Sequence, residues 1–257
     1  MELLITAGGT SEPIDQVRSI TNHSSGGLGK MIADQFLQAN HTVTYVTTKQ
    51  ALRPQPHKRL SIKEIETTAD LAQQLTTLFQ EKQFDSIIHC MAVSDFTSET
   101  AITEADFIQE LAQNLATTVD TQTPTDIAAA IKNTLNDIGT RPQKEQKISS
   151  STERLLLFLK KNPKIIAMIR QQQPETILVG FKLLVNVPKA ELLNVAMTTL
   201  VQNQCDFVFA NDLHYVHAID HQGYLLHKDG TVTPAQTKQA IAETIWRNVE
   251  QVWRSKK

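Results

Sequence analysis

The sequence contains few cysteines and aromatic residues, and it has no long apolar run. Its two cysteines, Cys90 and Cys205, lie in apolar stretches typical of strands, and neither belongs to a CxxC motif or a zinc-spaced Cys/His pair. We therefore expect buried, reduced thiols. No apolar stretch approaches the roughly 20 residues that span a bilayer. The first six residues have the pattern of a strand, and they do not resemble a signal peptide. The sequence therefore predicts a soluble, cytoplasmic protein without a membrane partner.

The chain also lacks an excess of charge of either sign. Its formal net charge is −2, with 25 Lys and Arg against 27 Asp and Glu among 257 residues. A nucleic-acid-binding domain usually carries a basic surface, so nucleic acid is not expected as a partner. Hydrophobic residues make up 40% of the chain, which is typical of a globular protein with a full core.

Strands and helices are predicted to alternate in the first third of the chain. The apolar pattern predicts strands at 1–6, 41–47 and 84–92 and helices at 28–39 and 71–81. Further strands are predicted at 155–158, 176–181 and 206–210, helices at 165–172 and 189–203, a hairpin at 223–233 and a terminal helix at 236–253. This order indicates an α/β fold with a doubly wound, mostly parallel, Rossmann-like sheet.

The middle of the chain differs in composition. Residues 101–146 are rich in Thr, Ala, Gln and Asp, with two short helices predicted at 105–115 and 125–135. We interpret this stretch as an insertion from the sheet within a single domain covering 1–257. A lid and a dimer contact are both open as its role.

Two polar loops with glycine follow the first predicted strand. One contains Gly8, Gly9 and Thr10, and the other contains Ser24, Ser25 and Gly26 directly before a helix. Free N–H groups at a helix N-terminus favour phosphate or carboxylate, and glycine allows a ligand to approach the backbone closely. Ordinary strand–helix connections would look similar, so the loops alone leave both interpretations open.

A Rossmann-type NAD(P)-binding reductase is the competing enzyme class. The first loop is not a GxGxxG motif that opens into a helix, and Thr47 and Thr48 stand where a ribose-binding carboxylate is expected. These features disfavour the reductase.

Residues 5–29 closely resemble the N-terminal signature of the phosphopantothenate–cysteine ligase family. Similar blocks follow in the family's order at 92–96, 147–150, 162–163, 180–182 and 210–212. The resemblance implies a ligase of coenzyme A biosynthesis that joins 4′-phosphopantothenate and cysteine through an acyl-nucleotide intermediate, with Mg²⁺ and a nucleoside triphosphate. It also implies a homodimer. The ligase strand starts at Met1, which is similar to the stand-alone form, so no flavin is expected.

The resemblance assigns roles to three residues directly. Asn22 matches the asparagine that holds the acyl-nucleotide, Arg18 matches an arginine near the substrate, and Lys147 matches the lysine that contacts the triphosphate. A non-catalytic regulator that only binds phosphopantothenate is a further alternative. The presence of Asn22 and Lys147 argues against it.

Other matching residues are expected to bind the nucleotide or close the site. The nucleotide set contains His89, Cys90, Met91, Asp95, Pro163, Lys164, Ile165, Ile166, Phe181 and Lys182. Core packing remains an equal interpretation for Cys90 and Met91. Asn211 and Asp212, which follow a predicted strand, are expected to close the same site. The metal ligands stay unassigned.

The identity of the nucleotide base rests on conflicting resemblances. Lys182 and the Lys-Ile-Ser-Ser block at 147–150 are similar to the ATP-using eukaryotic branch. The stand-alone bacterial form resembles the CTP-using fused enzymes in activity. We expect CTP, with ATP as the alternative.

Overall fold

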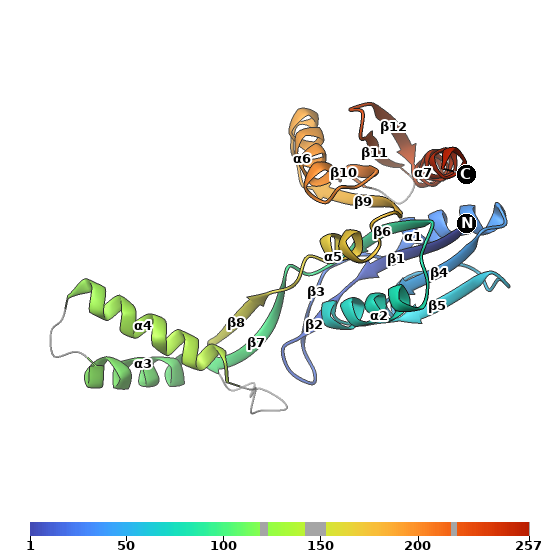
Figure 1. The fold of residues 1–257 in the computed structure, drawn as a ribbon. Coiled ribbons are helices and arrows are strands. Elements are labelled where there is room, and N and C mark those ends of the chain that lie inside the picture. The colour runs from blue at the N-terminus through green and yellow to red at the C-terminus, as the bar shows by residue number, and fades with distance from the viewer. Residues whose placement is uncertain (119–122, 142–152, 217–219, 257) are drawn as a thin grey trace. The chain divides into compact units, whose positions relative to one another are not determined.

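The computed structural model describes residues 1–118, 123–141, 153–216 and 220–256 (Figure 1). The chain divides into two compact units. The larger, called here the sheet unit, contains Met1–Thr10, Asn22–Val93 and Pro163–Lys257. The smaller, called the insertion unit, contains Ser11–Thr21 and Ser94–Asn162. The predicted insertion at 101–146 lies inside the second unit, which also takes in its flanks and a segment near the N-terminus.

An eight-stranded sheet forms the centre of the sheet unit. Its order is β12-β11-β10-β9-β6-β1-β4-β5. The strands are β1 (Glu2–Gly9), β4 (Thr42–Thr47), β5 (Leu60–Glu64), β6 (Ser86–Ala92), β9 (Ile177–Leu184), β10 (Phe207–Val216), β11 (Asp220–His227) and β12 (Val232–Thr237). Neighbours from β5 through β10 run parallel, and β11 and β12 form an antiparallel hairpin on β10. The predicted fold class and the predicted hairpin are confirmed.

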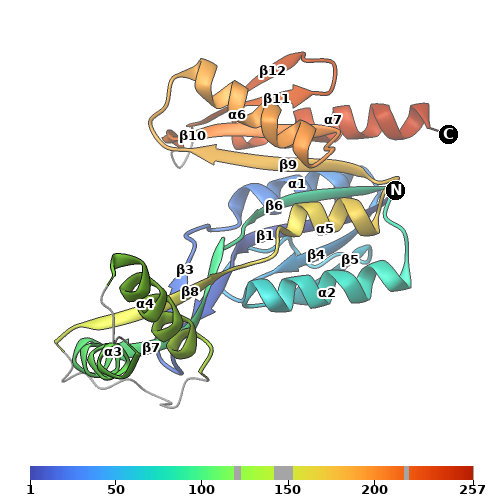
Figure 2. The same ribbon diagram turned by 60° about the vertical axis from the view of Figure 1, so that its left-hand side comes forward.

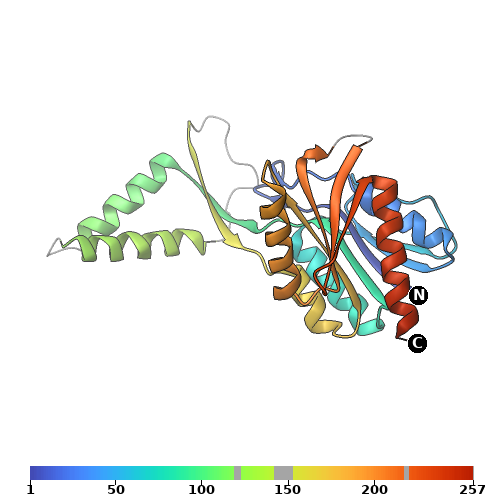
Figure 3. The ribbon, with the colours of Figure 1, turned by 90° about the horizontal axis from the view of Figure 1, so that it is seen from above.

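Helices cover both faces of this sheet, as Figures 2 and 3 show. The first face, called the α1 face, carries α1 (Gly27–Gln38) and α7 (Lys238–Ser255), which pack on a core that includes Leu3 and Ile5. The opposite face, called the α2 face, carries three helices around a second core that includes Leu4. They are α2 (Thr68–Glu81), α5 (Ile165–Gln172) and α6 (Lys189–Gln202). Successive strand residues point to opposite faces, so a parallel sheet covered on both sides needs continuous apolar strands.

The insertion unit contains two antiparallel strand pairs and two helices. The pairs are β2 (Ser11–Pro13) with β3 (Ser19–Thr21), and β7 (Phe96–Thr103) with β8 (Leu155–Lys161). The helices are α3 (Glu104–Thr118) and α4 (Pro124–Gly139), which confirm the two helices predicted for this stretch. Strands β2, β3, β5 and β7 are not predicted by the apolar pattern of the sequence. Two of these strands are three residues long and the others are largely polar, so the apolar pattern carries little signal for them.

The helix starts differ in how they are capped. Thr67 and Asp70 form a capping box at α2, and Thr123 caps α4. Gly26 is the N-cap residue of α1, and it has no side chain that could accept a hydrogen bond from the first turn. In the described parts of the chain, no helix is long and apolar enough to cross a membrane.

Candidate functional site

The strand order places a topological switch point between β1 and β6. These two strands are parallel neighbours, with Gly9 opposite Ala92 at their carboxyl ends. The chain leaving β1 enters α1 on one face of the sheet, while the chain leaving β6 leads on to α5 on the other face. Ligands of open α/β sheets bind at such a point, outside the carboxyl ends of the strands. The predicted glycine loops lie there.

Close backbone packing explains the glycines of these loops. Gly8 has a φ of 97°, and a Cβ there would lie 2.8 Å from the Thr48 hydroxyl and 2.9 Å from the Ala51 Cβ. A Cβ at Gly9 would collide with the carbonyl oxygen of Asn22. The backbone N–H of Asn22 donates to the carbonyl of Thr10 at 3.2 Å. The two loops are therefore joined backbone to backbone, and Asn22 is held at the end of β1.

The N-terminus of α1 has polar groups around it. The Ser24 hydroxyl accepts from the Gly26 N–H at 3.4 Å, and the Ser25 hydroxyl accepts from the Gly27 N–H at 3.3 Å. Gly26 has a φ of 71°, and a Cβ there would lie 3.0 Å from Ala51. The helix dipole and the first N–H groups of α1 favour an anion at this position. The start of α1 is therefore suited to an anion, and the phosphate site stays a prediction.

The side chains of His89, Cys90 and Met91 do not share one face of the sheet. Met91 belongs to the α2-face core, and Cys90 packs against the α1-face core. His89 is buried on the Met91 side, with its Nδ1 2.8 Å from the Thr6 hydroxyl. Burial lowers the pKa of His89 to about 4 and raises the pKa of Cys90 to about 12, so both side chains are neutral near pH 7.

The other residues of the sheet unit that were predicted to bind the nucleotide also lie on both faces of the sheet. Ile165 is buried in the α2-face core, and Ile166 packs against it. A Cβ at Gly180 would lie 2.9 Å from the Ile166 side chain, so this glycine permits close packing of α5 on the sheet. Lys164 is the N-cap of α5, directly after Pro163. Lys182 pairs in register with Ala210 on the α2 face, whereas Phe181 packs against the α1-face core.

Asp212 organises the loop that leaves β9. Its carboxylate accepts from the backbone N–H groups of Val187 at 2.8 Å, His214 at 2.8 Å and Asn186 at 2.9 Å. These hydrogen bonds hold the pKa of Asp212 below its ordinary value. The Asp212 carboxylate therefore stabilises the backbone conformation of this loop.

The neighbouring Asn211 contacts a residue that the sequence analysis missed. Its amide nitrogen Nδ2 lies 3.1 Å from the Nε2 of His221, and both side chains are buried. His221 stands ten residues later, on the far side of a hairpin. Local sequence patterns carry no signal for such a pair.

Two predicted residues belong to the insertion unit, and one lies outside the described residues. Arg18 stands in the turn between β2 and β3, where its guanidinium contacts the Asp15 carboxylate at 2.6 Å. Asp95 follows β6, and its carbonyl accepts from the Asn162 N–H at 2.9 Å. Lys147 lies outside the described residues.

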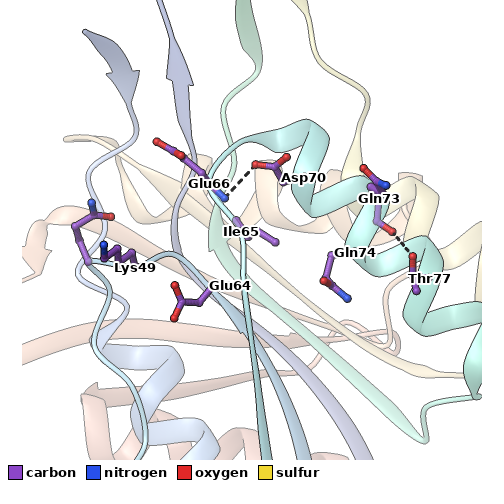
Figure 4. A pocket seen from close by; sticks show the side chains of 9 residues that line it. Lys49, Glu64, Ile65, Glu66, Asp70, Gln73, Gln74 and Thr77 are labelled. Carbon is purple, nitrogen blue, oxygen red and sulfur yellow. Dashed lines mark hydrogen bonds between the residues drawn. The ribbon is translucent and has the colours of Figure 1, made fainter. Parts of the chain in front are cut away.

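A surface pocket of about 580 Å³ lies elsewhere, beside α2 and the end of β5 (Figure 4). It contains none of the predicted site residues. The carboxylates of Glu64, Glu66 and Asp70 line it together with Lys49. Glu64 pairs with Arg53 at 2.8 Å, and Asp70 accepts from backbone N–H groups at the start of α2. This acidic lining is unsuited to phosphate. Among the described residues, no group of three or more His, Cys, Asp or Glu side chains could hold a metal ion.

Comparisons with known proteins identify the family of this chain. The model of the DNA/pantothenate metabolism flavoprotein C-terminal domain matches residues 1–134 and 106–252. The Coenzyme A biosynthesis bifunctional protein CoaBC of Vibrio cholerae is 31% identical over 253 residues, 95% of this chain and 50% of that protein. The corresponding protein of Thermococcus kodakarensis is 27% identical over 251 residues, 97% of this chain and 51% of that protein. This chain spans about half the length of these curated relatives.

Solved structures share the whole fold. The DNA/pantothenate metabolism flavoprotein from Streptococcus pneumoniae is 38% identical, covers 98% of this chain and 99% of its own, and has a TM-score of 0.80. A structure described as Cab2 mutant H337A complex with phosphopantothenate-cysteine covers 100% of this chain and 89% of its own, at 17% identity and a TM-score of 0.68.

Fold and site together define the class: a doubly wound α/β domain with glycine loops at its switch point. The chain belongs to the family of the DNA/pantothenate metabolism flavoprotein C-terminal domain. It corresponds to the ligase domain of the CoaBC proteins of coenzyme A biosynthesis, and the resemblance to phosphopantothenate–cysteine ligases is confirmed.

Proposed function

We propose that this protein joins 4′-phosphopantothenate to cysteine through an acyl-nucleotide formed from CTP. The observation that carries the proposal is the meeting of both glycine loops and the Asn22 backbone at the β1–β6 switch point. Family membership supports the same reaction. The structure described as a complex with phosphopantothenate-cysteine has this fold, which adds support for the product class.

The chemistry explains why such a site is needed. A carboxylate resists attack by an amine until its oxygen is converted into a good leaving group. Transfer of a nucleotide to that oxygen achieves this, and the mixed anhydride must then be held until cysteine arrives. Donors at the α1 N-terminus are suited to phosphate oxygens, and the neutral Asn22 amide is suited to holding the anhydride without attacking it.

Magnesium fits this site as a companion of the triphosphate. Mg²⁺ is commonly bound through one or two carboxylates together with substrate phosphates and waters. The Asp212 carboxylate already accepts from three backbone N–H groups, and the described residues form no ready-made metal cluster. We propose that Mg²⁺, bound together with the triphosphate, would supply neutralisation of the phosphate charge.

We also propose that two copies associate through β7 and β8. Phe96, Leu157 and Leu159 are 36–49% exposed, and the strand register places them on one face of this pair. Phe158 points to the opposite face, where it lies against Gly139 of α4. A two-stranded ribbon with three exposed apolar side chains on one face is marginal by itself, and a second copy would cover them.

The ligase assay tests the reaction and the base together. Wild-type protein is incubated with 4′-phosphopantothenate, cysteine, Mg²⁺ and either CTP or ATP, and both pyrophosphate and the coupled product are measured. We expect CTP to support turnover at least about tenfold better than ATP, since a site with hydrogen bonds to one base rejects another strongly. Equal rates would refute the CTP assignment, and the absence of product with both nucleotides would refute the ligase.

Two lysine variants extend this assay. Lys147→Gln is expected to slow pyrophosphate release more than any later step. The substitution removes a lysine ammonium that we expect to lie beside the negatively charged triphosphate. Lys182→Ala is expected to weaken CTP and ATP alike, since we assign Lys182 to phosphate. A change in base preference in the Lys182 variant would show that Lys182 contacts the base.

A further inference from the structure

The segment 48–52, called here the β4 loop, follows β4 and packs against the start of α1. A Cβ at Gly26 would lie 3.0 Å from the Cβ of Ala51 and 3.4 Å from the backbone nitrogen of Leu52. The Leu52 N–H donates to the Ser25 carbonyl at 2.9 Å. The β4 loop therefore helps to determine where the backbone lies directly before α1.

The buried hydroxyl of Tyr45 holds the β4 loop. Tyr45 is 0% exposed, and its hydroxyl donates to the Leu52 carbonyl at 3.1 Å. A Cβ at Gly29, in the first turn of α1, would lie 3.6 Å from the same hydroxyl oxygen. Burial raises the pKa of Tyr45 well above its ordinary value, so the hydroxyl keeps its proton and remains a donor. Leu52 thus accepts from Tyr45 with its carbonyl and donates to Ser25 with its N–H.

A second anchor holds the β4 loop from the solvent side. The Arg53 guanidinium donates to the Lys49 carbonyl at 3.3 Å and pairs with the Glu64 carboxylate at 2.8 Å. Both charged side chains are partly accessible to solvent, and such pairs stabilise a protein only weakly. Loss of the Tyr45 hydrogen bond is therefore expected to shift the β4 loop without releasing it.

The start of α1 is where the proposed function needs hydrogen-bond donors. Ser24 and Ser25 are exposed there, and the first N–H groups of an α-helix have no partner within the helix. A hydrogen bond weakens steeply when its distance or angle departs from the ideal. A small displacement of Ser25 and Gly26 would therefore weaken phosphate binding while the fold is retained.

We propose that Tyr45 is a positioning residue for a substrate phosphate: through the β4 loop, its hydroxyl fixes the backbone N–H groups that bind the phosphate at the start of α1. This inference rests on the proposed ligase function, because both 4′-phosphopantothenate and CTP bring phosphate to the site. Tyr45 acts without touching the substrate, since its side chain is buried in the α1-face core.

The first test needs no turnover. The backbone amide signals of Gly26, Gly27 and Leu28 are followed by NMR of ¹⁵N-labelled protein while inorganic phosphate is added. We expect the wild-type signals to shift in a saturable way. The apparent Kd should rise about five- to tenfold in Tyr45→Phe, the worth of one hydrogen bond. Wild-type amides that do not respond to phosphate, or an equal Kd in both proteins, would overturn the inference.

Ser86→Ala is the matched control for the loss of a buried hydroxyl. The Ser86 hydroxyl is buried and donates to the Ile177 carbonyl at 2.9 Å, as the Tyr45 hydroxyl does to another carbonyl. Ser86 is the first residue of β6, at the amino end of the sheet. Urea unfolding should show a similar loss of stability in the two variants, and only Tyr45→Phe should bind phosphate more weakly. Equal weakening in both would refute the positioning role.

Steady-state kinetics then identifies which substrate carries the phosphate. In Tyr45→Phe the KM for 4′-phosphopantothenate or for CTP should rise about five- to tenfold, while kcat changes less than about twofold. The substrate whose KM rises is the one that binds at α1, and an unchanged KM for both would contradict the proposal. If wild-type protein yields no ligase product, the proposed function fails, and the phosphate titration still tests Tyr45.

A second variant serves if Tyr45→Phe does not fold. The Ala51 Cβ lies against the positions that a Cβ at Gly8 or at Gly26 would occupy. Ala51→Gly removes this contact and loosens the β4 loop, while Tyr45 keeps its place in the core. The same weakening of phosphate binding is expected, and wild-type affinity in the Ala51 variant would overturn the proposal.

Discussion

The carbonyl oxygen of Asn22 occupies the space that a Cβ at Gly9 would need. This contact joins the end of β1 to the segment that precedes α1, and the hydrogen bond from the Asn22 N–H to the Thr10 carbonyl reinforces it. The position of Asn22 therefore depends on the absence of a side chain two residues after Ala7. Both residues lie in the block that carries the family resemblance, and the contact gives a physical reason for the glycine.

Gly9→Ala is expected to move Asn22 and to lower ligase turnover by more than about tenfold, since small misplacements at a reacting centre are costly. Steady-state product formation measures the effect. Gly139→Ala is the control, because its added Cβ would meet Phe158 at an ordinary distance of 3.4 Å. Full activity of the Gly9 variant would show that the loop tolerates the displacement.

Asn22→Ala is expected to fold normally and to release pyrophosphate while losing the acyl-nucleotide to water. One such contact is worth about 2.7–4 kcal/mol by analogy with an oxyanion-hole donor, which corresponds to a hundredfold or more in coupled product. The ratio of product to pyrophosphate is the measurement. Retention of the wild-type ratio would remove Asn22 from the mechanism.

Asp212→Asn is expected to loosen the loop after β9, because an amide cannot accept from three backbone N–H groups as the carboxylate does. Hydrogen exchange at Asn186 and Val187 should accelerate, and the denaturant midpoint should fall. Asp137→Asn, at an exposed position of α4, should leave both unchanged. Unaltered exchange at the two amides would contradict the role of Asp212 in this loop.

His89 is expected to make the protein acid-sensitive between about pH 6.5 and pH 4. Its folded pKa of about 4 lies below the ordinary value of 6.5, so the unfolded chain binds the extra proton in this window. The free energy of unfolding must then fall as the pH falls, by an order of 3 kcal/mol at most. Urea unfolding of wild type and of His89→Gln at several pH values measures the difference. The exposed His57→Gln should behave as wild type, and an equal pH slope in the His89 variant would contradict the assignment.

Leu157→Lys is expected to separate the proposed dimer into monomers, since it places a charge in the apolar face of β7 and β8. Sedimentation of wild type and variant measures the association state. Leu135→Lys is the matched control, because Leu135 is similarly exposed, at 37%, but lies on α4. A wild-type monomer at all concentrations, or a variant that remains dimeric, would contradict the proposed interface.

The sequence by itself predicted the parallel sheet, its helices and the glycine loops. Strands such as β1 and β6 are buried on both faces and therefore read as continuous apolar runs, while α2 and α4 have periodic apolar faces. Gly8, Gly9 and Gly26 stand out because glycine is scarce in this chain. These signals are local, so they survive without knowledge of the tertiary fold.

Only the tertiary structure decided which side chains meet. The residues His89, Cys90 and Met91 are consecutive, yet the alternation of the strand sends them to two faces. Asn211 and His221 are ten residues apart and become partners because a hairpin with a shifted register brings them together. Asp212 is drawn into a loop that begins about 25 residues earlier. Strand order and register determine these contacts, and both depend on how the apolar faces of distant segments are buried together.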